Sequence, residues 1–159
     1  METINFIVEG KKEEISIINK PHLDFWTVGI NRKIYATKGF IKNFSKQEIK
    51  ILLYHELFHK YHDSKIIILI ILGCAFLVPK LFNQQILLGG SIPVIIWSTF
   101  NLIESLADIY ASRKVGKSVY LQILKKYSKT KDKERLAGVT RQITHLPHPI
   151  RHWIIEKLG

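Results

Sequence analysis

The sequence of 159 residues has one cysteine, Cys74, so it cannot form a disulfide within the chain. This absence excludes a disulfide-stapled scaffold and is compatible with a reducing compartment. The chain also does not begin with basic residues followed by an early apolar core, and its start therefore does not resemble a secretory signal peptide. Any insertion into a membrane would have to come from an internal segment.

Charge is almost missing from the middle of the chain, where Lys80 is the one charged residue between positions 66 and 103. Residues 65–82 and 86–103 are each near 18 residues long, and a helix of that length covers roughly 27 Å, close to a hydrocarbon core of about 30 Å. A polar turn at residues 83–85 would join them. The pattern predicts a transmembrane helical hairpin, and the alternative is a hairpin buried within a soluble protein.

Basic residues flank this apolar block on both sides and give a formal net charge of +11. Eleven Lys and Arg lie in residues 1–65 and twelve in residues 104–159. The positive-inside rule then predicts a multi-pass protein of the cell membrane with two transmembrane helices and both termini in the cytoplasm. The lipid bilayer is an expected partner, and nucleic acid is not. A basic nucleic-acid-binding protein stays open as a rival hypothesis, prompted by the charge alone.

Secondary-structure signals outside the block indicate an α+β fold in a single domain, residues 1–159, with the hairpin inserted at about 65–103. β-Branched residues predict strands at 3–8, 15–18, 25–28 and 33–37, which would form a small N-terminal antiparallel sheet. A charged turn is expected at 9–14. A capping box, Ser45 to Glu48, predicts a helix from about 46 to 63. C-terminal helices are expected near 105–115, 118–127, 133–143 and 150–158.

The stretch YHELFHK, residues 54–60, carries the chemistry. His55 and His59 are four residues apart, share one helical face and can bind one metal ion at about 2.0–2.1 Å. Glu56 is rotated by one position, so it can stay off the metal and still act on a metal-activated water. The alternative is an amphipathic helix with two incidental histidines.

A third ligand separates these two interpretations. His62 is too far along the helix axis from His55, about 10.5 Å, to share the ion with both histidines. Glu104 and Asp108 are the first acidic residues after the apolar hairpin, and the hairpin would return them to the histidines. Glu104 can then complete a site of two histidines and one carboxylate, and Asp108 can accept the other ring N–H of a ligand histidine.

The segments HELFH and ESLADIYASRKVG, separated by two apolar segments, resemble the M48 family of membrane zinc metallopeptidases, the HtpX and Ste24 type, which are gluzincins. The upstream segment DFWTVGINRKIYATKGF and the C-terminal HPIRHWIIEKL also resemble that family. The resemblance covers about residues 15–157. It implies a zincin-type active-site helix and an integral-membrane zinc-dependent metalloendopeptidase that hydrolyses peptide bonds with a zinc-activated water.

The resemblance further implies one Zn²⁺ per chain, held by His55, His59 and Glu104, with Glu56 as general base and acid and Asp108 behind the ligands. Unfolded or membrane-associated polypeptides are the implied substrates, with the active site on the cytoplasmic side. An edge strand would bind them in extended form through Phe25, Trp26, Thr27, Val28 and Gly29. His148, in the H-P pair, is a candidate for stabilising the oxyanion, and the alternative is a packing role. A catalytically inactive or latent metal-binding membrane sensor is the alternative function.

Overall fold

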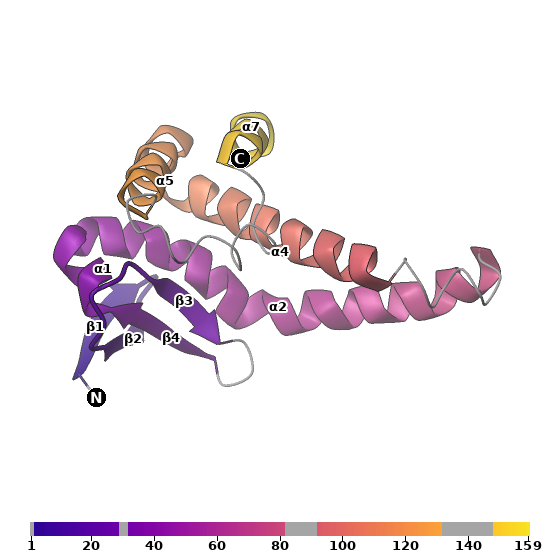
Figure 1. Cartoon of the computed structure of the whole chain (residues 1–159), viewed down its shortest axis with the longest axis horizontal. Coiled ribbons are helices and arrows are strands. Elements are labelled where there is room, and N and C mark those ends of the chain that lie inside the picture. Colours follow the sequence, from indigo (N-terminus) through magenta and orange to yellow (C-terminus); the bar gives the residue numbers. More distant parts are fainter. Residues whose placement is uncertain (1, 29–31, 82–91, 132–147) are drawn as a thin grey trace.

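The computed structural model describes residues 2–28, 32–81, 92–131 and 148–159 (Figure 1). The strands are β1 (Glu2–Val8), β2 (Lys11–Ile18), β3 (Phe25–Val28) and β4 (Lys33–Thr37), and the helices are α1 (Lys38–Asn43), α2 (Lys46–Leu81), α4 (Ile92–Val115), α5 (Lys117–Lys131) and α7 (His148–Leu158). Figure 1 shows α2 between the sheet on one side and α4, α5 and α7 on the other. The α+β class is therefore as predicted.

The sheet has the order β1-β2-β4-β3 and is mixed. The outer pairs, β1 with β2 and β3 with β4, are antiparallel, but β2 and β4 are parallel. The prediction of an antiparallel sheet is wrong at this central pair, because the chain places β3 beyond β4 at the edge. The predicted charged turn at 9–14 is also wrong. The turn is confined to Glu9 and Gly10, which both have positive φ, and β2 begins at Lys11.

Helix α2 begins where the capping box predicts. The Ser45 backbone N–H donates to Glu48 Oε2 at 2.8 Å, and the Glu48 N–H donates to Ser45 Oγ at 3.2 Å. The predicted end near residue 63 is wrong, since α2 continues without a break for 36 residues. No glycine or proline occurs between residues 60 and 72, so no strong stop signal interrupts the helix there.

Two apolar clusters hold α2 in place. On the sheet side, α2 contributes Ile49, Leu52, Leu53 and Leu57 to a core with side chains of the strands and α1. On the opposite side, Ile51 of α2 packs in a cluster with Ala111, Tyr120, Leu124 and Ile155. This second cluster joins α4, α5 and α7 to α2, so the helix is buried on two faces over its first half.

Helices α2 and α4 pack against each other as an antiparallel pair, with Phe58, Ile103 and Ala107 at their contact (Figure 1). The prediction that this hairpin spans a membrane is wrong, since none of the helices in the described ranges is both long enough and apolar enough to cross one. Of the second predicted span, residues 92–103 lie in α4, and residues 86–91 lie outside the described residues. The prediction of a two-span protein of the cell membrane, with cytoplasmic termini, is corrected on the same ground. The predicted turn at 83–85 and the helix at 133–143 lie outside the described residues.

Candidate metal centre

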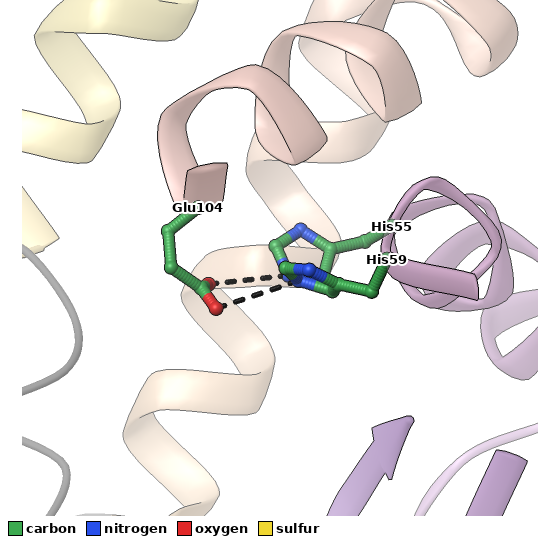
Figure 2. A group of neighbouring side chains, drawn as sticks. All are labelled: His55, His59 and Glu104. Carbon is green, nitrogen blue, oxygen red and sulfur yellow. Dashed lines mark hydrogen bonds and ion pairs between the residues drawn. The ribbon is translucent and has the colours of Figure 1, made fainter. Parts of the chain in front are cut away.

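The two histidines of α2 and the glutamate of α4 converge on one point. His55 Nε2 lies 3.0 Å from His59 Nε2, and the Glu104 carboxylate lies 3.3 Å from His55 Nε2 and 3.4 Å from His59 Nε2. Figure 2 shows both imidazoles leaving α2 side by side and pointing at the two carboxylate oxygens. The antiparallel packing of α2 against α4 makes this convergence possible across 45 residues of sequence.

These separations suit a shared cation. Ligand atoms placed tetrahedrally at about 2.0–2.1 Å from an ion stand about 3.3 Å from one another. The observed distances between nitrogen and oxygen atoms, 3.3 and 3.4 Å, agree with that value. The group His55, His59 and Glu104 could therefore hold a metal ion.

Each histidine has its own carboxylate behind it. Asp108 Oδ1 lies 2.9 Å from His55 Nδ1, and both oxygens of Asp63 lie 3.0 Å from His59 Nδ1. A carboxylate at Nδ1 keeps a proton on that nitrogen and turns Nε2 toward the Glu104 side. Both rings are thus oriented for metal binding through Nε2.

Asp108 is almost completely buried and accepts hydrogen bonds from two further elements. Arg151 of α7 donates from Nε at 2.7 Å and from a terminal nitrogen at 2.6 Å, and the Tyr120 hydroxyl of α5 donates at 2.8 Å. Burial alone would raise the pKa of Asp108, but Arg151 and His55 outweigh burial and hold that pKa well below its usual range. Asp108 is therefore held as a buried anion by Arg151, Tyr120 and His55.

Burial and these carboxylates act in opposite directions on His55. Burial lowers the pKa of the imidazole, but hydrogen bonds to Asp108 and Glu104 outweigh it and raise the pKa to about 10. In the protein without metal, His55 is accordingly protonated at neutral pH. A metal ion that binds Nε2 must displace that proton.

Glu56 lies beside the cluster and is 8% exposed. Burial raises the pKa of its carboxyl, while His55 and His59 work against that rise. Its backbone carbonyl accepts a hydrogen bond from Thr27 Oγ1 of β3 at 3.0 Å. This bond ties the edge strand to the helix turn that carries the metal ligands.

A cavity of about 560 Å³ opens over the cluster. The cluster side chains and Glu56 line it together with β3, α4, α5 and α7. Phe25, Trp26 and Thr27 are the β3 residues at its wall. β3 is the last strand of the sheet order and pairs with β4 alone among the described strands, so no described strand occupies its other edge.

The remaining predicted site residues divide into those that the structure describes and those that it does not. Phe25 stacks on Phe40 at 4.7 Å, and Trp26 stacks on Tyr35 at 5.6 Å, so both also have packing roles. Val28 ends β3, and its side chain lies outside the description, as does all of Gly29. His148 is the first residue of α7, and its side chain is likewise outside the description.

Sequence reasoning missed three residues of this centre: Asp63, Tyr120 and Arg151. Asp63 had a usable signal, because it follows His59 by four residues and a helix places it on the same face. Tyr120 and Arg151 had none, because their contacts depend on how α5 and α7 fold back onto α4. His62 lies apart from the cluster and packs between Phe58 and Tyr110.

In comparisons with known proteins, no family model, curated protein or solved structure matches the chain.

Proposed function

We propose that this protein is a zinc-dependent endopeptidase of the M48 type, acting on unfolded polypeptides. One observation carries the proposal: His55, His59 and Glu104 converge at metal-ligand spacing next to Glu56, within a cavity walled by an edge strand. Two imidazoles and one carboxylate with an open fourth position are the donor set of catalytic zinc sites in hydrolases. The resemblance of the HELFH and ESLAD segments to that family supports the same assignment.

The residues around the cluster have separable roles in this proposal. Zinc, when bound, supplies Lewis acidity toward a water molecule and a peptide carbonyl. Asp108 and Asp63 hold the Nδ1 protons of His55 and His59, so both imidazoles bind as neutral ligands. Glu56 takes the proton from the attacking water and transfers it to the nitrogen of the leaving amine.

Burial suits Glu56 to both steps. A carboxylate with an ordinary pKa is a weak base at neutral pH, and burial moves the pKa of Glu56 upward, toward the working pH. The Glu56 side chain follows His55 by one residue in α2, so it lines the cavity without being one of the three metal ligands. Its role is therefore that of a proton carrier beside the ligands.

The substrate peptide would bind as an added strand along β3. Main-chain hydrogen bonds to β3 hold an extended peptide with little dependence on its sequence. The hydrogen bond that Thr27 Oγ1 donates to the Glu56 carbonyl fixes the position of β3 relative to α2. A peptide on β3 would accordingly cross the cavity next to Glu56 and the three ligands.

Zinc content and proteolysis of three variants test the proposal. We expect Glu56→Gln to keep one zinc per chain and lose casein cleavage, by a factor of at least about 100. Glu104→Ala should lose both zinc and cleavage. Glu14→Gln, at an exposed position on β2, is the matched control and should retain both.

Two results would refute the proposal. Casein cleavage by Glu56→Gln at the rate of the unsubstituted protein would refute the assignment of Glu56 as the general base. Zinc bound by the unsubstituted protein without cleavage of casein or of any unstructured peptide would instead indicate a metal-binding protein without peptidase activity.

A further inference from the structure

The cavity over the metal centre is elongated along α2. Besides Glu56, its lining residues on that helix are Leu52, His55, His59, Asp63 and Ile67, which recur every three or four positions and so lie along one face. At 1.5 Å per residue, Leu52 and Ile67 are about 22 Å apart along the axis. An extended peptide of about six or seven residues fits that length.

The wall of the cavity is mixed toward Leu52. Leu52, with Leu124 and Tyr127 of α5, contributes apolar surface. Lys20, His22 and Asp24, of the segment that leads into β3, contribute polar groups to the lining. The buried Thr37 side chain holds this segment, because its hydroxyl accepts from the Asp24 N–H at 3.0 Å and donates to the His22 carbonyl. Gly39 lets the segment approach α1, since a Cβ there would overlap the carbonyl oxygen of Pro21.

The opposite end is apolar. Ile67 of α2 and Phe100 and Ile103 of α4 line it. Ile103 is buried, but Ile67 is 37% exposed and Phe100 is 46% exposed. Large apolar side chains left partly open at the wall of a cavity indicate a place where an apolar group binds.

The direction of β3 relates these two ends to a bound peptide. Figure 1 shows β3 and α2 running the same way, so β3 begins toward the Leu52 end of the cavity and ends toward the Ile67 end. A peptide paired antiparallel to β3, the more stable arrangement, runs from the Ile67 end to the Leu52 end. The metal ligands lie between, since His55 and His59 stand between Leu52 and Ile67 in α2.

We propose that Ile67, Phe100 and Ile103 form a subsite for a bulky apolar side chain on the amino-terminal side of the scissile bond. This inference rests on the proposed peptidase function and adds its substrate preference. The occupant is a peptide rather than a second copy of the chain, because Ile67 and Phe100 belong to the same cavity as the metal ligands and the β3 edge.

Paired peptide substrates test the subsite in the zinc-loaded protein. One set varies the residues before the scissile bond among Leu, Phe, Gln and Gly, and a second set varies the residues after it. We expect kcat/KM to be at least about tenfold higher for Leu or Phe than for Gln in the first set, which corresponds to about 1.4 kcal/mol. The second set should show less than about threefold variation between Leu and Gln.

Variants at exposed positions link the preference to these side chains. Phe100→Gln and Ile67→Gln should each reduce the Leu-to-Gln ratio to below about threefold, and their partial exposure makes both substitutions compatible with folding. Leu102→Gln is the matched control: Leu102 is 49% exposed on the same helix and does not line the cavity. Its Leu-to-Gln ratio should equal that of the unsubstituted protein.

The outcomes separate the subsite from the peptidase assignment. Cleavage without preference, a preference confined to residues after the scissile bond, or a ratio unchanged in both Phe100→Gln and Ile67→Gln would overturn the subsite and leave the peptidase intact. If no peptide is cleaved, the affinity of labelled seven-residue peptides, measured by fluorescence polarisation, tests the subsite instead. Tighter binding of peptides with an apolar amino-terminal half, weakened by Phe100→Gln, supports the subsite although the peptidase fails, and equal binding of all peptides overturns it.

Discussion

The buried pair of Asp108 and Arg151 should be the strongest electrostatic contact between α7 and the rest of the protein. The Asp108 side chain is 1% exposed and the Arg151 side chain is 14% exposed, with bidentate contacts of 2.6 and 2.7 Å. Removing one partner of such a pair leaves an uncompensated buried charge, which costs about 3–5 kcal/mol. We therefore expect Asp108→Asn and Arg151→Gln each to lower the free energy of unfolding by that amount.

The double variant distinguishes a charge effect from lost packing. With both charges replaced by amides, no charged Arg151 remains without its carboxylate, and His55 loses the same partner in Asp108→Asn as in the double variant. The double variant should therefore lose at least about 2 kcal/mol less than the sum of the two single losses. Urea unfolding, followed by the fluorescence of the three tryptophans, measures all four proteins. Excess EDTA keeps metal binding out of the comparison.

The exposed pair of Glu9 and Lys114 provides the control. Its contact is equally short, 2.6 Å, but the two side chains are 48% and 39% exposed. Water screens such a pair, and the same cycle with Glu9→Gln and Lys114→Gln should give a coupling below about 1 kcal/mol. Additivity of the Asp108 and Arg151 losses within about 0.5 kcal/mol would refute the assignment of a buried, coupled pair.

Two further predictions concern the carboxylates behind the histidines. Asp63→Asn should weaken zinc binding by about 10–100-fold, measured by competition with a chelator, because His59 loses the anionic acceptor for its Nδ1 proton; an unchanged affinity would contradict that role. The pKa of Asp108 is lowered in the folded state, so its contribution to stability is present above its ordinary value of 3.8 and is lost as pH falls through the lowered folded value. The difference in unfolding free energy between the unsubstituted protein and Asp108→Asn should accordingly shrink between pH 5 and pH 2, and a difference that grows over that range would contradict it.

Local sequence patterns predicted where the helix of the site begins, but they did not predict where it ends or how the strands pair. The capping box at Ser45 and Glu48 indicates the start of α2, because its two hydrogen bonds are made within four residues. The end of α2 and the parallel pairing of β2 with β4 were both missed. Each depends on packing between distant segments, which a local period does not report.

The apolar block misled the prediction for a related reason. Hydropathy over residues 65–103 records that the side chains are apolar, but it does not record which polar segments share a helix with them. Residues 65–81 continue the ligand-bearing half of α2, and residues 92–103 continue into the ligand-bearing half of α4. Among the described residues, neither helix is long and apolar enough to cross a membrane.

The sequence by itself determined which donors were available and how two of them are spaced, because the helical period places His55 and His59 on one face wherever that helix lies. Tertiary structure decided the rest of the metal centre. Glu104 reaches the histidines because α4 packs antiparallel to α2, and Asp108 is held as an anion because α5 and α7 bring Tyr120 and Arg151 to it. A spacing within one helix is a local property, whereas the meeting of four helices depends on the burial of their shared apolar faces.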